Sequence, residues 1–412
     1  MFSPGRTYPV LCLGQFAATA GLTIVVPLLP FYLAGIGTPR SEIPWWTAVS
    51  VAAPAVVQLV SGPLWGWVGD RFGHKAMVVR AHAGLGLAIA LMALADTPEQ
   101  FLACRLLQGA CGGVVSATAS YASAAASTDR RGRALGMLFG ATAAGSLLGP
   151  LVGGLLATRL GFGPLFAAVA AMLALSSVLA AVSLVEPPAQ RRERSSPRAV
   201  AALLLRRRES RLMLLAGFAA QAAIYALVVV FAPQVERISG SVATAAVWVG
   251  VLQAVTWTAS CAGSPWWGRR NDHRPAQAGF AVAAACCAVA VALQGVVPVE
   301  LLVPLRVVQG FCFAALLQSV LHVSSGQVPE RGSGTAFGFS TGVLDLGQVF
   351  GPLAGAALAV LLPPAVVFSL IGALLGVAAL LAVLGRPTSG AEVPAGTSLP
   401  HGPVEIDEKV LR

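Results

Sequence analysis

Residues 101–109 read FLACRLLQG, and residues 302–310 read LVPLRVVQG. Both stretches contain the pattern R-x-x-Q-G, and in each the arginine is the only basic or acidic side chain, histidine apart, of a long apolar run. A pattern of this kind that returns after about 200 residues is hard to obtain by chance. The corresponding polar residues are Arg105 with Arg306 and Gln108 with Gln309.

Three further elements return at nearly the same spacing. They are Arg131-Gly132 with Arg331-Gly332, Gly149-Pro150 with Gly351-Pro352, and GWVGDRFGHK (66–75) with GRRNDHRPAQ (268–277). The chain is therefore expected to consist of two related halves. Parallel repeats are arranged around an axis along the membrane normal, and substrate is handled between them near the midplane.

The composition is that of a membrane protein. Of the 412 residues, 56% are hydrophobic and only 11% are charged, whereas soluble domains carry about 25% charged residues. Backbone groups in lipid must be satisfied within helices or closed barrels, and long apolar runs without alternation favour helices. Twelve runs can cross a hydrocarbon core of ~30 Å. We expect spans at 7–39, 43–69, 76–95, 100–126, 134–158, 163–185, 212–235, 242–268, 276–299, 301–327, 333–362 and 365–385.

Lysine and arginine residues predict the orientation of these spans. With the N-terminus inside, nearly all of them fall on the cytoplasmic side, and only Arg40, Arg159 and Arg237 fall outside. The net charge of +10 then reflects topology, and no nucleic-acid partner is expected. The predicted parts are an N-terminal six-helix half at 1–185, a basic cytoplasmic linker at 186–211, a C-terminal six-helix half at 212–386 and a disordered cytoplasmic tail at 387–412.

Three motifs resemble those of the major facilitator superfamily, and within it the drug:proton antiporter branch. The resemblance covers residues 7–386 and implies an all-α membrane fold of 12 transmembrane helices in two pseudo-symmetric halves. In the first motif, His74 stands where the family usually has Arg or Lys. The motifs are Gly66-x-x-x-Asp70-Arg71-x-Gly73-His74-Lys75, Leu102-x-x-Arg105-x-x-Gln108-Gly109 and Gly145-x-x-x-Gly149-Pro150-x-x-Gly153-Gly154.

The resemblance implies a role for each motif. The loop at 66–75 would latch the two halves in one access state, although a loop that only sets topology is the simpler alternative. The fifth-span motif is associated with antiport, although close helix packing alone would explain its glycines. The latch residues are Gly66, Asp70, Arg71, Gly73 and Lys75, with Asp272 as the aspartate of the second half.

A few charges lie deep within the predicted spans. An arginine at the centre of a helix in lipid costs ~2.5–3.5 kcal/mol on insertion scales, so Arg105 and Arg306 should face a wet cavity or a polar partner. Asp345 is the only carboxylate deep within a span, and it is the leading candidate to carry a proton. Proton coupling is assigned to Arg105, Asp345 and Arg306; the alternatives are a structural network for the arginines and permanent neutralisation of an arginine by Asp345. Arg80, near the end of its span, is expected to snorkel to the interface.

Several uncharged polar residues also lie within the spans. They are candidates to line a substrate cavity, although the sequence does not show which of them face the centre. The candidates are Gln15, Gln108, Gln221, Tyr225, Gln253, Gln309 and Gln348.

The expected function is proton-coupled efflux of lipophilic compounds, as in multidrug resistance, by an antiporter. The second hypothesis is export of an anionic metabolite such as a carboxylate siderophore, because two deep arginines against one aspartate favour neutral or anionic cargo. An uptake symporter and a non-transporting membrane sensor rank lower. No serine–histidine dyad, metal cluster or phosphate loop indicates an enzyme or a cofactor, and the energy source would be the proton gradient.

The expected location is the cytoplasmic (inner) membrane of a bacterium, with both termini in the cytoplasm. The partners would be a small-molecule substrate and the lipid bilayer, and the chain is expected to function as a monomer. The seven cysteines all lie within apolar stretches without metal or disulfide spacing, which predicts buried, inert thiols.

Overall fold

A computed structural model describes residues 4–125, 131–187, 196–328 and 333–386. Within these ranges the chain is almost entirely helical, and twelve segments are long and apolar enough to cross a membrane. This confirms the predicted all-α fold with twelve spans. The predicted tail at 387–412 lies outside the described residues.

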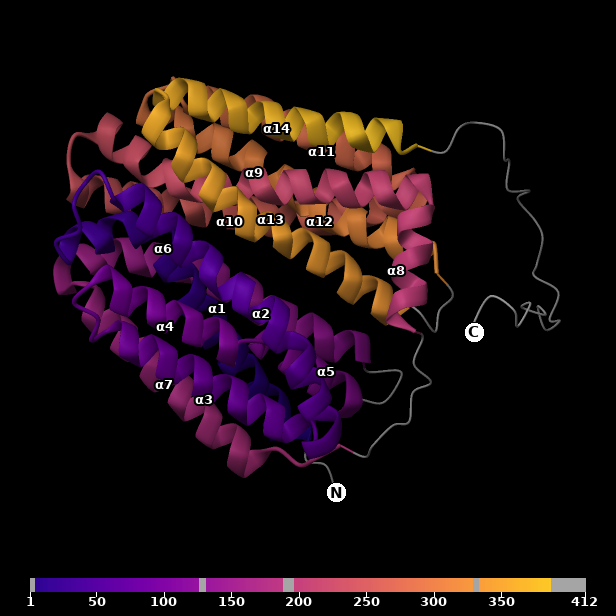
Figure 1. Cartoon of the computed structure of the whole chain (residues 1–412). Coiled ribbons are helices and arrows are strands. Elements are labelled where there is room, and N and C mark those ends of the chain that lie inside the picture. Colours follow the sequence, from indigo (N-terminus) through magenta and orange to yellow (C-terminus); the bar gives the residue numbers. More distant parts are fainter. Residues whose placement is uncertain (1–3, 126–130, 188–195, 329–332, 387–412) are drawn as a thin grey trace.

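The helices form two bundles that lie side by side, one from each half of the chain (Figure 1). In the described part of the N-terminal half these are α1 (Pro4–Gly35), α2 (Ile43–Phe72), α3 (His74–Met92), α4 (Pro98–Cys111), α5 (Val114–Ala125), α6 (Arg131–Leu160) and α7 (Phe162–Ser183). The C-terminal half has α9 (Arg208–Ser239), α10 (Val242–His273), α11 (Ala276–Gln294), η2 (Val299–Leu301), α12 (Leu302–Gly326), α13 (Ser333–Leu361) and α14 (Pro364–Leu384). The predicted linker contains the short helix α8 (Pro197–Arg206) and the first residues of α9.

Local signals set several helix ends. Thr97 precedes α4 and its side chain accepts a hydrogen bond from the backbone N–H of Gln100 at 3.3 Å, and Ser241 caps α10 in the same way through Thr244 at 3.2 Å. Gly240 ends α9 with a φ of 76°, a left-handed conformation that glycine adopts without steric cost. These caps place the turns between spans where the apolar runs are interrupted.

Equivalent helices of the two halves make equivalent contacts. The pair α1 and α6 corresponds to α9 and α13, α2 and α4 to α10 and α12, and α3 and α7 to α11 and α14. The repeat in the sequence is therefore a repeat in three dimensions.

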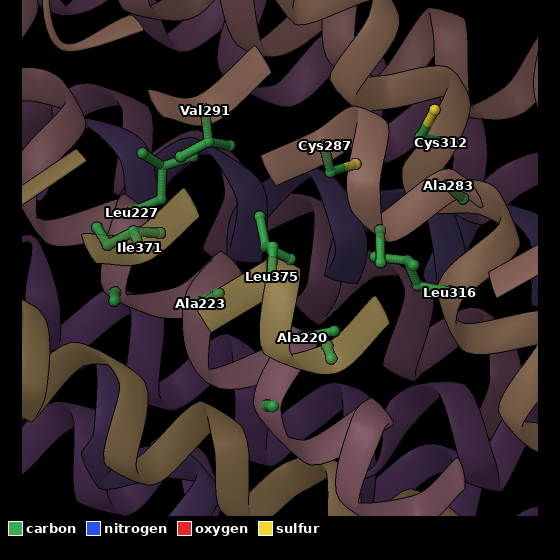
Figure 2. Close-up of a cluster of buried hydrophobic side chains, with 14 of the residues drawn as sticks. Ala220, Ala223, Leu227, Ala283, Cys287, Val291, Cys312, Leu316, Ile371 and Leu375 are labelled. Carbon is green, nitrogen blue, oxygen red and sulfur yellow. The ribbon is translucent and has the colours of Figure 1, made fainter. Parts of the chain in front are cut away.

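The core of the C-terminal half is built from small and branched side chains at helical spacing. Figure 2 shows alanines and Leu227 of α9 packed with Cys287 and Val291 of α11, Leu316 of α12 and Leu375 of α14. Outside the cores, large apolar side chains point outward, as with Val182, which is 80% exposed, and Leu361, which is 76% exposed. Such an outer surface suits lipid and not water.

The two halves meet through α6 with α10 and through α2 with α13. We call the end of the molecule that carries Pro4, α8 and the end of α14 the linker side, and the opposite end the far side (Figure 1). At the far side, a Cβ added to Gly154 of α6 would lie 2.7 Å from the carbonyl oxygen of Ala246 in α10, and one added to Gly250 would lie 2.5 Å from that of Pro150. The backbones are therefore in direct contact there.

The same helices separate toward the linker side. Gly136 and Gly140 share a face of α6 with Gly154, yet a Cβ added to either of them would meet nothing within 4 Å. The same holds for Gly66 of α2 and Gly338 of α13. The structure is therefore closed at the far side and separated at the linker side.

Candidate functional site between the two halves

Arg105 in α4 and Arg306 in α12 are both buried, each 3% exposed. The glycine that follows each motif brings its helix against a neighbour: a Cβ on Gly109 would lie 2.5 Å from the carbonyl oxygen of Pro54 in α2, and Gly310 lies equally tightly against Thr256 in α10. The glycine of each motif thus lets two helices pack closely. The arginine of each motif is equally buried beside that contact.

The surroundings of Arg105 supply its hydrogen-bond acceptors. Its Nε donates to the carbonyl oxygen of Ser50 at 2.8 Å, and its Nη1 donates to Oε1 of Gln108 at 2.6 Å. Gln108 was predicted to line the substrate cavity, and it is 5% exposed and bonded to Arg105. The arginine and the glutamine form one satisfied pair.

The described residues around Arg306 supply no hydrogen-bond acceptor for its guanidinium group. No hydrogen bond joins its side chain to the described residues, and its Nε is buried without a partner there. The guanidinium carbon lies 3.4 Å from the ring centroid of Phe231 in α9, a cation–π contact. Gln309 is bonded elsewhere, because its Oε1 accepts from Nε2 of Gln294 at 2.8 Å.

Arg306 lines a cavity of about 70 Å³ between the halves. Two of the predicted cavity residues, Gln253 and Gln309, line it as well, and Val26 and Pro27 of α1 close it from the N-terminal half. The walls are otherwise apolar side chains of α9 and α12, namely Ile224, Leu227, Val228, Phe231 and Phe313. A positive side chain and two amides thus face a small, mostly apolar space.

Asp345 of α13 belongs to a second group of polar side chains, which we call the central charge cluster: Arg105, Tyr225 and Asp345. Tyr225 of α9 lies within electrostatic range of both Arg105 and Asp345, and it packs against the core of the N-terminal half. Asp345 is partly buried and forms no hydrogen bond or ion pair with the described residues. The cluster therefore joins charged groups from both halves.

The other predicted cavity residues take different places. Gln15 is 1% exposed and fully bonded, since its Nε2 donates to Thr142 at 2.8 Å and its Oε1 accepts from Thr118 at 2.6 Å. It joins α1, α5 and α6. Gln221 is half-buried where α9 packs on Gly347 of α13, and Gln348 is half-buried on α13.

The loop at 66–75 is bound to the start of the linker. Gly73 has a φ of 92°, and the backbone N–H groups of His74 and Lys75, the first residues of α3, donate to the carboxylate of Glu186 at 2.6 and 2.8 Å. A carboxylate at a helix N-terminus is favoured by the helix dipole. The carboxylate at the start of α3 is therefore that of Glu186. The side chains of Asp70 and Asp272, which the sequence analysis assigns to the latch, lie outside what the structure describes. Arg71 points over the ring of its neighbour Phe72 at 5.9 Å.

The glycines of the fifth-span motif pack α6 against two helices. A Cβ on Gly145 would lie 2.7 Å from the carbonyl oxygen of Phe16, and one on Gly153 would lie 3.0 Å from Ile24, both in α1. Gly149 lies against Ala20 of α1, with Pro150 next to it, and Gly154 faces α10. The motif therefore holds α1 and the far-side contact between the halves at once.

The fourth span is broken at Gly112 and Gly113, where Gly113 has a φ of 92°. Side chains bind carbonyl groups at this break. Ser61 donates at 3.1 Å to the carbonyl of Gly109, which also accepts the N–H of Gly112, and Trp65 donates to the carbonyl of Ala110 at 2.6 Å. Arg80 donates to the carbonyls of Cys111 and Gly112 and stacks on Trp65 at 3.8 Å. The guanidinium of Arg80 therefore binds the end of a helix within the protein, and its expected reach to the membrane interface stays a prediction.

Sequence reasoning missed Glu186, Gln294 and Phe231. Glu186 was assigned to the linker. Its contact with the start of α3 exists only because the end of α7 lies next to α3 in the fold. Gln294 and Phe231 stand in apolar spans, and only helix packing brings them to Gln309 and Arg306. No motif marks these residues.

Two pseudo-symmetric bundles of six spans, with buried charges where they meet, define a membrane transporter of the kind that moves small molecules between two halves. The model of the Major Facilitator Superfamily matches residues 11–297 and 249–411. The chain belongs to this superfamily, whose members are transporters and not enzymes.

Curated relatives extend over most of the chain. A staphyloferrin B transporter of Staphylococcus aureus is 36% identical over 389 residues, which is 93% of each chain. Multidrug resistance protein MdtG of Escherichia fergusonii is 29% identical over 361 residues, 86% of this chain and 88% of its own. Both are similar to this protein along nearly their whole length.

Solved structures confirm the fold. A bacterial homologue of the human lysosomal transporter Spinster, in an inward-facing and unoccupied conformation, superposes with a TM-score of 0.74 at 15% identity and covers 95% of this chain and 100% of its own. The nucleoside transporter NupG gives 0.76 at 13% identity and covers 92% of this chain and 100% of its own.

Proposed function

We propose that this transporter exports a small anionic metabolite of the carboxylate-siderophore class in exchange for protons. The observation that carries the proposal is the charge balance between the halves, where Arg105 and Arg306 are buried and Asp345 is the one carboxylate deep within a span. Fixed positive charge in a low-dielectric site attracts anions and repels cations. The 36% identity to a staphyloferrin B transporter supports the same class of cargo.

Efflux of lipophilic compounds, which the motifs favour, is the second candidate. It is supported by the 29% identity to a multidrug resistance protein and by the apolar walls of the cavity. We place it second because the buried arginines oppose the lipophilic cations that such exporters carry, and because the siderophore transporter is more similar to this chain.

The direction of transport is part of the proposal. The excess of basic residues on the linker side supports a cytoplasmic location for that side. The proposal also includes a location in the inner membrane of a bacterium and function as a monomer. In the conformation of the structure, cargo would then enter from the cytoplasm. Separation of Gly154 from Gly250 and closure of α2 on α13 would release it outside.

Proton coupling is assigned to the central charge cluster. Asp345 is the group that can gain and lose a proton. Tyr225 lies within electrostatic range of both Asp345 and Arg105, and so it connects them. Because Tyr225 and Asp345 belong to one half and Arg105 to the other, a change of charge on Asp345 would alter the attraction between the halves.

Everted membrane vesicles test the function directly. Iron-free staphyloferrin B and the lipophilic cation ethidium would be offered outside, with and without a respiration-driven pH gradient. We expect saturable accumulation of the siderophore that a protonophore abolishes, and little accumulation of ethidium. Accumulation of ethidium alone would replace the proposal by the second candidate, and siderophore uptake that ignores the pH gradient would remove the proton antiport.

A further inference from the structure

The two arginines of the repeat stand at equivalent positions, but only one of them is satisfied by the protein. We propose that Arg306 binds a carboxylate group of the cargo and that Arg105 does not. This inference rests on the proposed function, because it assigns the contact that selects an anion. It also gives the two members of a symmetric pair different tasks.

A proline explains why Arg105 is satisfied. Pro54 lies within α2 and has no backbone N–H, so the carbonyl of Ser50, one turn earlier, is not used by the helix. That carbonyl accepts the hydrogen bond from Nε of Arg105 at 2.8 Å. Gln108 completes the set, and the guanidinium is held by its own half.

The C-terminal half lacks this acceptor. Thr256 of α10 stands where Pro54 stands, since each lies against the glycine of its motif. Its backbone N–H continues the helix, and its hydroxyl also donates to the carbonyl of Leu252 at 2.8 Å. The carbonyl that corresponds to that of Ser50 is therefore already occupied, and Arg306 gains no backbone partner.

A glutamine removes the second possible acceptor. Gln294 stands at the end of α11, where the N-terminal half has Met92 at the end of α3. Nε2 of Gln294 donates a hydrogen bond to Oε1 of Gln309 at 2.8 Å, so this oxygen is bonded to Gln294 and not to the arginine. Gln309 thus cannot bond Arg306 through this oxygen as Gln108 bonds Arg105.

The unsatisfied guanidinium faces a space that suits a carboxylate. Arg306 lines the cavity of about 70 Å³ and is supported from one side by the ring of Phe231 at 3.4 Å. Such a stacked guanidinium keeps the plane of its N–H donors free for a bidentate pair with a carboxylate. The amides of Gln253 and Gln309 line the same cavity.

Equilibrium binding to the full-length chain in nanodiscs tests the inference. The probes are iron-free staphyloferrin B, radiolabelled citrate as a simple tricarboxylate, and triethyl citrate as its neutral match. Wild-type protein is expected to bind the carboxylates and to prefer citrate over its ester. Arg306→Gln should lower carboxylate affinity at least ~10-fold, as expected for loss of a charge-assisted hydrogen-bond pair, and Arg306→Lys should recover part of it.

A second variant keeps the arginine. Gln294→Met reproduces the residue of the N-terminal half and frees Gln309 to bond Arg306, so carboxylate affinity should fall although no positive charge is lost. This result stays informative if Arg306→Gln does not fold, which size-exclusion chromatography of the purified protein would show. Unchanged affinity in Gln294→Met and in every folded Arg306 variant would overturn the inference.

Two outcomes separate this inference from the proposed function. If wild-type vesicles transport the siderophore and Arg306→Gln does so with the same KM, the inference is wrong and the function stands. If wild-type vesicles do not transport it, the function itself is wrong. Wild-type protein that binds neither carboxylate, or binds triethyl citrate as tightly as citrate, also overturns the inference.

Discussion

At the scale of single residues, hydrogen-bond partners separate side chains that look alike in the sequence. Arg105 and Arg306 share a motif and an exposed fraction of 3%, but one has protein acceptors and the other has a cavity. A buried arginine is costly without partners. Its partners, more than its position, therefore indicate what it does.

Asp345→Asn tests the assignment of the proton. The variant keeps the size of the side chain but cannot ionise, so accumulation driven by a pH gradient should be lost. Exchange of labelled for unlabelled cargo without a gradient should continue, because the alternating halves remain intact. The control is Asp96→Asn, an exposed position between α3 and α4. Gradient-driven accumulation that survives in Asp345→Asn would exclude this carboxylate as the proton carrier.

Arg105→Gln tests the different tasks of the two arginines. Because Nε and Nη1 of Arg105 already donate to Ser50 and Gln108, citrate binding in nanodiscs should stay within ~3-fold of wild type, well below the ~10-fold loss expected for a missing charge-assisted pair. Transport in vesicles should nevertheless be lost, since the central charge cluster loses its positive member. A fall in citrate affinity as large as that of Arg306→Gln would contradict this division.

At the scale of elements, the fourth span shows how a broken helix is tolerated in lipid. Carbonyl groups at a helix break in the membrane need donors, and Ser61, Trp65 and Arg80 donate to those at this break from α2 and α3. The glycines at the break are visible in the sequence. The donors are not, because they lie one or two helices earlier and their role depends on packing. For the same reason the sequence did not mark Glu186 as the carboxylate at the start of α3.

Arg80→Ala should destabilise the protein through this break. Removal of the guanidinium leaves two carbonyls without their side-chain donor and Trp65 without its stacked cation. We expect a loss of about 1–3 kcal/mol in the free energy of unfolding, measured by thermal or denaturant unfolding in detergent. Arg40→Ala, at an exposed arginine between α1 and α2, is the matched control. Equal stability of the two variants would show that water replaces Arg80.

At the scale of the whole molecule, the two halves touch closely at the far side and separate toward the linker side. The contact depends on glycines, because Gly154 of α6 and Gly250 of α10 leave no room for a side chain. Such a contact can open and close without rearranging either bundle. The transport that we propose requires a second state, in which this contact is open.

Gly250→Leu should act as a wedge at this contact. Its side chain cannot fit against Pro150 and Gly154, so the far side should open and transport should fall. Spin labels would be attached at Arg40 and Gly240, one in each half at the far side. Opening would lengthen the distance between the two labels, measured by electron paramagnetic resonance. The control is Gly376→Leu on α14, where a Cβ meets nothing within 4 Å. An unchanged distance in Gly250→Leu would mean that this contact does not hold the far side closed.

The sequence by itself determined the twelve spans, the two related halves and the few charges buried among them, because apolar length and a repeated motif are local properties of the chain. Only the tertiary structure decided which arginine is satisfied, which carboxylate caps α3 and which side of the molecule is closed. These depend on hydrogen bonds and backbone contacts between helices distant in the chain. Pro54 illustrates the difference: the residue is plain in the sequence, but the carbonyl that it frees acquires a meaning only when α4 packs beside it.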